Sequence, residues 1–224
     1  MHIPLDMVRG LDMKNYAKLA AGLIVGWFHV AFAASAVRLF KNESNRFGIA
    51  LALAALAPIV AFSLWFAMSQ KFRHFALSLN PRILTSVQSW RILGFVFVLL
   101  QAHGILPATF ALPAGYGDMV VGASAPLVAW RLARPSRRGS FILWQLLGIA
   151  DLIMAVSLGT TARLSSAPGT SMGAMTALPL SLVPTFIVPL LFIFHVICIA
   201  QARTWKGTSG EIRPTSRPLE VTVA

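Results

Sequence analysis

Six stretches of this chain run for about 20 residues with almost no charged side chain, which is the length that an α-helix needs to cross a bilayer. They cover residues 19–37, 47–70, 91–110, 113–132, 139–162 and 178–201. Only 12% of the 224 residues are charged, about half the share that is typical of soluble domains. The sequence therefore predicts an all-α fold, a polytopic membrane bundle of six transmembrane helices.

The longest uncharged stretch must fold back once. Between Arg91 and Arg131 the only charged residue is Asp118, and this distance is about twice one span. Pro107 and the run Leu112-Pro113-Ala114-Gly115 mark the expected turn, because proline and glycine interrupt helices. The fourth span is then predicted to begin within this run, which places Asp118 about one turn inside the outer surface.

The basic residues alternate between the connections. Fifteen of the 19 Lys and Arg residues fall before the first span, in the 69–91 and 131–140 connections and in the tail. The alternate connections hold only four: Arg38, Lys41, Arg46 and Arg163. The positive-inside rule then predicts that both termini are cytoplasmic. We interpret the net charge of +12 as topology and attraction to lipid headgroups, and expect no nucleic-acid partner.

The chain reads as one domain with two polar ends. Residues 1–16 form a polar N-terminal lead, 17–203 the six-helix transmembrane domain, and 204–224 a cytoplasmic tail whose composition predicts disorder. The single cysteine, Cys198, excludes an intrachain disulfide and is expected to be an apolar filler. Besides the lipid bilayer, a small solute and a second copy of the chain remain open as partners.

Asp151 is the most demanding residue within the predicted spans. It lies at the centre of a stretch bounded by Arg138 and Arg163. An isolated charged carboxylate at that depth costs roughly 3 kcal/mol, so it must be protonated, paired or hydrated. Two interpretations remain open: a site that carries a proton or cation, and a hydrogen bond that holds two helices together.

Three intramembrane histidines offer partners for such a site. His29 or His103 could pair with Asp151, or with Asp118 at the outer side, and pass protons. Alternatively, His29 and His103 could bind a b-type haem from facing helices, with His195 as a further candidate ligand for haem or quinone. No metal site is predicted, because no pair of ligands has the helical spacing of His-x3-His.

Arg91 is predicted to open the third span at the cytoplasmic face. There its planar fork of donors could hold an anionic headgroup or a substrate carboxylate. In the sixth span, Pro179, Pro184 and Pro189 predict bends. In the fourth, Asp118, Gly122, Ala125 and Ala129 share one helical face, whose small residues permit close packing.

The segment Gly115-Tyr116-Gly117-Asp118-Met119 resembles the end of a potassium-channel selectivity filter. In that family a Thr-Val pair precedes Gly-Tyr-Gly, and the threonine oxygen and backbone carbonyls replace the water shell of the ion. Here Pro113 and Ala114 stand at those positions, so an ion filter is not expected. In its LPAGYGD…G…AP segment and its architecture the chain resembles small multi-pass proteins of the bacterial inner membrane. That resemblance implies a location and no chemistry.

Three functions are compatible with these patterns. The first is a transporter or permease for a small solute, proton-coupled through an intramembrane site of Asp151, His29, His103 and Asp118. The second is a redox protein that holds haem or quinone through His29, His103 or His195. The third is a membrane scaffold or assembly subunit whose polar residues only join helices. Catalytic residues are not predicted, and enzymatic activity is not expected.

Overall fold

The computed structural model describes residues 5–41, 49–164 and 171–205. Within these ranges the chain is helical and forms no strand, which confirms the all-α prediction. The elements are α1 (Leu5–Ala36), α2 (Ile49–Met68), α3 (Gln70–Ser78), α4 (Pro81–Val87), the 3₁₀ helix η1 (Gln88–Gly94), α5 (Phe95–Ala102), α6 (Ala108–Arg131), η2 (Pro135–Arg137), α7 (Arg138–Leu164), η3 (Met172–Thr176), the π-helical η4 (Val183–Ile187) and α8 (Val188–Thr204).

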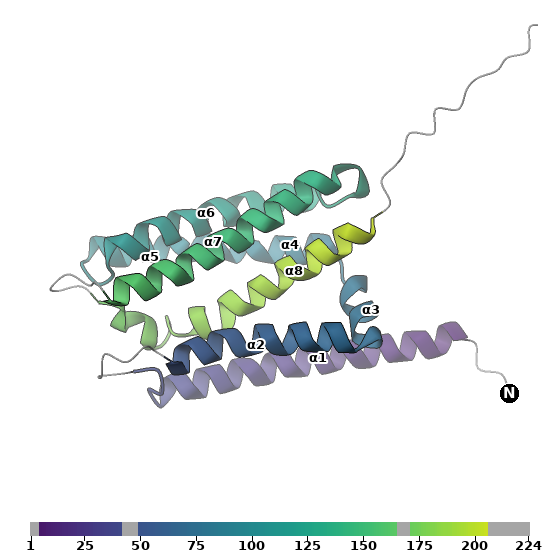
Figure 1. Ribbon diagram of the computed structural model, residues 1–224, viewed down its shortest axis with the longest axis horizontal. Helices are drawn as coiled ribbons and strands as arrows, with labels where there is room; N and C mark the ends of the chain where they lie inside the picture. Colours follow the sequence, from purple (N-terminus) through teal and green to yellow (C-terminus); the bar gives the residue numbers. More distant parts are fainter. Residues whose placement is uncertain (1–4, 42–48, 165–170, 206–224) are drawn as a thin grey trace, which may run out of the picture.

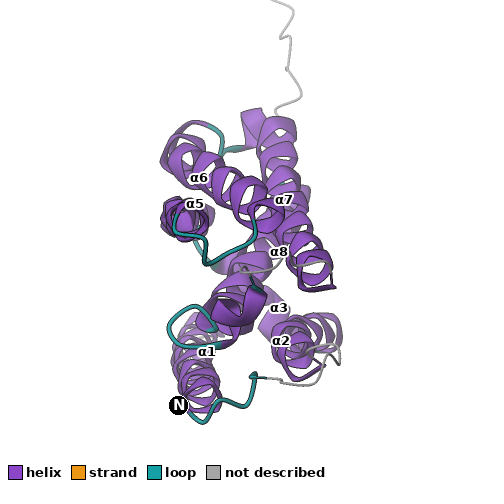
Figure 2. Cartoon of the chain, turned by 90° about the vertical axis from the view of Figure 1, so that its left-hand side faces the viewer, coloured by secondary structure: helices purple, strands orange, loops and turns teal. Residues whose placement is uncertain are grey.

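The long helices lie roughly along one axis, and the start of α1 and the end of α8 are at the same end of the bundle as α3 (Figure 1). Figure 2 shows α1 and α2 on one side, α6 and α7 on the other, and α8 between them. Within the described part of the chain, five segments are long and apolar enough to cross a membrane: 13–36, 49–68, 81–102, 135–162 and 183–204. Helix α6, with its glycines, prolines and Asp118, is not among them.

The outer surface of this bundle is apolar. No residue of α2 is buried, and large aliphatic side chains such as Leu53, Val120 and Leu147 are exposed on three different helices. Water does not solvate such a surface favourably, whereas hydrocarbon does. The surface is therefore compatible with a protein surrounded by lipid.

The two polar ends have different outcomes. The predicted lead, 1–16, is helical from Leu5 onward, where it forms the first part of the long helix α1. Disorder was predicted for residues 204–224. Almost all of this range, 206–224, lies outside the described residues.

The third long segment begins ten residues earlier than predicted. Asn80 caps α4 by accepting a hydrogen bond from the backbone N–H of Arg82, and Pro81 occupies the first helical position. The chain then continues through η1 into α5. Arg91 consequently lies near the middle of this segment and not at its end, so the predicted boundary at Arg91 was wrong.

The predicted turn is confirmed at Pro107, whereas its second part, the run 112–115, was wrong. The chain reverses at residues 103–107, where Gly104 has a φ of 69° and Pro107 precedes the first residue of α6. Pro113 lies inside α6. Asp118 is therefore in the middle of this helix, about three turns from its start, and not one turn inside the surface.

Two other expectations agree with the structure. The small face of α6 is buried at Gly122, Ala125 and Ala129, and it packs chiefly against η1. The sixth segment is irregular where its prolines lie: the π-helical turn η4 contains Pro184, and Pro189 follows at the start of α8. Proline removes one backbone donor from the helix at each position, which accounts for the interrupted hydrogen bonding.

Candidate functional site: a buried arginine between two aspartates

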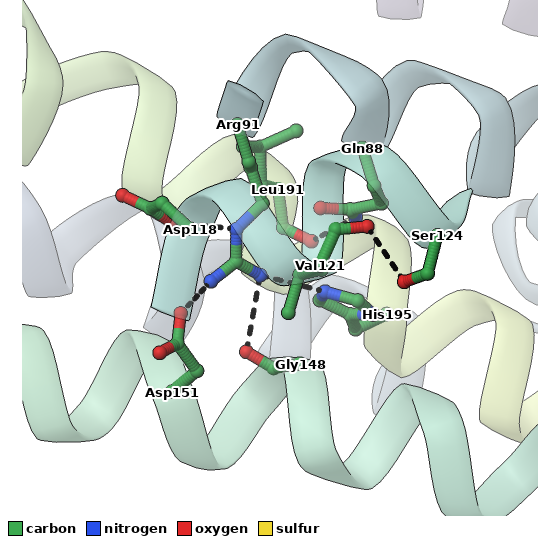
Figure 3. A network of polar contacts seen from close by, with 9 residues as sticks. All are labelled: Gln88, Arg91, Asp118, Val121, Ser124, Gly148, Asp151, Leu191 and His195. Carbon is green, nitrogen blue, oxygen red and sulfur yellow. Dashed lines mark hydrogen bonds and ion pairs between the residues drawn. The ribbon is translucent and has the colours of Figure 1, made fainter. Parts of the chain in front are cut away.

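The centre of the bundle holds an ion-paired cluster of Arg91, Asp118 and Asp151, which we call the triad (Figure 3). Arg91 comes from η1, Asp118 from α6 and Asp151 from α7. The Nε of Arg91 donates to Oδ1 of Asp118 at 2.7 Å, and its Nη2 donates to Oδ2 of Asp151. The arginine side chain is only 2% exposed, while the aspartates are 15% and 11% exposed.

The remaining guanidinium nitrogen joins the triad to α7 and α8. Nη1 of Arg91 donates to the carbonyl of Gly148 at 3.2 Å and lies 3.4 Å from Nε2 of His195. Because a guanidinium can only donate, Nε2 is the acceptor and the Nδ1 of His195 carries the proton. That Nδ1 then donates to Oε1 of Gln145. The imidazole is therefore held as a neutral ring with both nitrogens occupied.

A line of buried polar groups continues from His195 toward α4. The amide of Gln145 donates to Oγ1 of Thr85 at 3.1 Å, and Oγ1 lies 3.8 Å from Sγ of Cys198. These side chains come from α7, α4 and α8, so the line ties three helices together. A fully paired polar network of this kind fixes the relative positions of the helices that contribute to it.

Glycines let the helices approach closely enough for the triad to form. A Cβ on Gly117 would overlap the carboxylate of Asp151, and a Cβ on Gly122 would overlap the backbone of Arg91 and Ile92. Glycine is the residue that permits backbones to pack at such short range. The Gly-Tyr-Gly segment thus lies within α6 and packs against neighbouring helices.

A cavity of about 410 Å³ reaches the triad through Asp118. Its walls come from α2, α5, α6, α7, η3, η4 and the start of α8, and they are mostly apolar. Among the described residues of the wall, Asp118 is the only charged one, and Thr160 and Thr176 are also polar. A transport site at Asp151 would need a cavity that reaches this residue. The cavity is lined by Asp118 instead, which shares the guanidinium with Asp151.

The structure brings together only some of the predicted site residues. Asp118 and Asp151 meet at Arg91, which is buried there and not placed at a lipid headgroup. His29 and His103 are exposed, and the Nδ1 of each lies 2.7–2.8 Å from a carbonyl four residues earlier in its own helix. The predicted pairing of His29 or His103 with Asp118 or Asp151 is therefore not present in the structure.

The positions of the three histidines give little support to the haem interpretation. His195 has both ring nitrogens engaged with Arg91 and Gln145, so ligation of iron would break one of these contacts. His29 and His103 remain accessible but lie outside the interior cluster. Among the described residues, no three His, Cys, Asp or Glu side chains are grouped as a metal site.

Sequence reasoning missed Gln145 and Gly148 as parts of the site. Trp144 and Gln145 lie near the start of the predicted span 139–162, where tryptophan is common at the membrane interface. The available signal was helical spacing: Gln145, Gly148 and Asp151 recur every third residue and so share one face of α7. That face meets Arg91 and His195.

We expect Gly117→Ala to displace the Asp151 carboxylate and lower the free energy of unfolding by about 1–3 kcal/mol, as overpacking does. The overlapping atoms belong to the end of one side chain, so the helices need not separate. Equilibrium unfolding in detergent measures the change. Gly26→Ala is the matched control, because no atom lies within 4 Å of its added Cβ. An equal gain in stability for both variants would contradict the close approach at Gly117.

The fold and the triad define a class of protein: an all-helical bundle with helices long and apolar enough to cross a membrane and an ion-paired cluster in its interior. The chain belongs to the DUF8737 family, a domain of unknown function, whose model matches residues 46–203. This range contains every residue of the triad together with Gln145 and His195. Comparison with curated proteins and with solved structures gave no match.

Proposed function

We propose that this protein is a proton-coupled transporter of a small solute. It spans the bacterial inner membrane six times, with α6 as the fourth crossing and both termini in the cytoplasm. The observation that carries the proposal is the triad: two carboxylates share one buried guanidinium, and one of the two forms part of a cavity wall.

The distribution of charge supports this orientation. Lys14 near the start of α1, Arg131 at the end of α6, Arg138 at the start of α7 and Arg203 at the end of α8 belong to the end of the bundle that holds α3 (Figure 1). Basic residues concentrate on the cytoplasmic side of inner-membrane proteins. The end of the bundle at which α1 begins and α8 ends is therefore assigned to the cytoplasm.

The charge balance of the triad supports proton coupling. One guanidinium and two ionised carboxylates sum to −1, and His195 adds nothing as a neutral ring. An uncompensated charge in a poorly solvated interior is costly. The triad therefore favours binding one proton or one cation, and exchange between the two is the step that couples a solute to protons.

The cavity supplies the second requirement of a transporter, which is access. It places Asp118 in contact with a space large enough for a small molecule. The irregular turn η4 forms part of the same wall, and interrupted helices line the binding sites of many transporters. A scaffold requires neither an excess carboxylate nor a cavity beside it.

We expect the triad of the purified protein to hold an exchangeable proton. A pH jump followed by infrared difference spectroscopy should reveal a carboxylic-acid C=O band that is lost in both Asp118→Asn and Asp151→Asn. In proteoliposomes with an internal pH dye, solutes from a panel of amines, carboxylates, sugars and amino acids are then added one by one. At least one class should move protons, and Asp151→Asn should slow this movement by about 100-fold or more.

Asp12→Asn, in α1 and outside the triad, is the control for removing a carboxylate. The proposal is overturned if the infrared band is the same in wild type and in both triad variants, because the triad then exchanges no proton. A folded Asp151→Asn protein that keeps its full cellular role would support the scaffold interpretation instead.

A further inference from the structure

We infer that the cavity beside Asp118 binds a small organic cation with an apolar body, and that this cation competes with the proton held by the triad. The inference rests on the proposed function and names the class of solute. It is carried by the placement of the Asp118 carboxylate in a wall whose other described residues are mostly apolar.

The charge of the site favours a monovalent cation. Oδ1 of Asp118 accepts from Arg91, and no described residue donates to its other oxygen. The triad is short of one positive charge when both carboxylates are ionised. A monovalent cation in the cavity brings the sum to zero, as one proton does, so the two exclude each other. An anion at the same place would raise the uncompensated negative charge.

The wall suits an organic cation better than a metal ion. Phe97 and Phe110 are buried, line the cavity and lie with ring centroids 5.5 Å apart. Aromatic faces attract alkylammonium groups. Met172 and Met175 add polarisable side chains to the same wall. A hard metal cation would instead need several oxygen ligands, and the wall offers mainly carbon.

The way in lies between α2 and α7. Exposed apolar side chains from both helices border the cavity there, among them Leu53 and Leu56 from α2 and Val156 from α7. A neighbouring cavity of about 690 Å³ shares Met172 and Thr176 but has a more polar lining, which includes Ser35, Arg38 and Ser171 and suits an apolar body less. An apolar cation can therefore enter from the bilayer side through the gap between α2 and α7.

The test uses three probes with the same apolar body: phenylbutyltrimethylammonium, phenylbutanol and phenylbutanoate. Binding to the full-length protein in lipid nanodiscs is measured by equilibrium dialysis, with empty nanodiscs as the blank. We expect saturable binding of the ammonium probe, about 10-fold or more tighter than the alcohol, with affinity that falls as the pH is lowered. The carboxylate probe should bind most weakly.

Two kinds of variant place the site. Asp118→Asn should abolish the preference for the ammonium probe over the alcohol. Val156→Trp should weaken binding of all probes by filling the entrance without touching the triad. Leu147→Trp is its matched control, because Leu147 is also exposed on α7 but lies outside the cavity wall. If Asp118→Asn does not fold, the tryptophan pair still decides the location.

The outcomes separate this inference from the proposed function. Equal binding of the three probes, or tightest binding of phenylbutanoate, overturns the cation assignment and indicates a slot for lipid tails or for anionic amphiphiles. Proton coupling then still stands if the infrared band depends on Asp118 and Asp151. Loss of the proton signal in turn overturns the proposed function, whatever the probes do.

Discussion

Arg91→Met is expected to lower the free energy of unfolding in detergent by about 3–5 kcal/mol, because it leaves two buried carboxylates without their shared cation. The methionine fills much of the volume of the arginine stem, so the loss reports charge and hydrogen bonding and not a cavity. The variant also frees the carbonyl of Gly148 and Nε2 of His195. Equilibrium unfolding followed by tryptophan fluorescence measures the change.

Removing the two carboxylates together with Arg91 should restore stability. In the triple variant Arg91→Met, Asp118→Asn, Asp151→Asn no ionised group of the triad remains, and most of the lost stability should return, as it does when buried ion pairs are replaced together. Arg82→Met, an exposed arginine of α4, is the matched control and should change stability by less than about 0.5 kcal/mol. Equal losses for Arg91→Met and the triple variant would contradict the ion-pair account.

Hydropathy was sufficient to predict the class of fold. Long uncharged stretches predicted helices at the positions of α1, α2, α7 and α8, since composition alone decides which segments can lie in hydrocarbon. It was insufficient for the ends of the third and fourth segments. We treated Arg91 as a boundary because an isolated charge is costly inside a bilayer. A charge that is paired with two carboxylates from other helices does not mark a boundary.

Because Arg91 was placed at the boundary of a span, the composition of the candidate site was also predicted wrongly. With Arg91 at the surface, the carboxylates lacked a cation, and His29 and His103 were the remaining candidates. The cue in the sequence was the count of intramembrane charges: Asp118, Asp151 and Arg91 nearly balance one another. Pairing across three helices depends on their relative rotation, which no local pattern specifies. His195 was noticed as a candidate ligand only, because its neighbour Gln145 comes from another helix.

Among the described glycines, Gly122 is the position at which a change to alanine is expected to be most damaging. Its Cβ would overlap the backbone of η1 at Arg91 and Ile92, and backbone cannot rotate aside as a side chain can. Helix α6 must therefore shift away from η1, at a cost of about 1–3 kcal/mol or more. The shift also pulls Asp118 from Arg91, so the infrared proton signal should weaken together with stability.

Gly22→Ala in α1 is the control, because no atom lies within 4 Å of its added Cβ and alanine is the better helix former. It should leave stability equal or slightly higher. Comparison of Gly122→Ala with Gly117→Ala then separates two roles of the glycines in α6. The first should move helices and lower both readouts, whereas the second should move one carboxylate and change the proton signal with a smaller loss of stability. Identical behaviour of Gly122→Ala and Gly22→Ala would show that η1 and α6 are not packed backbone to backbone.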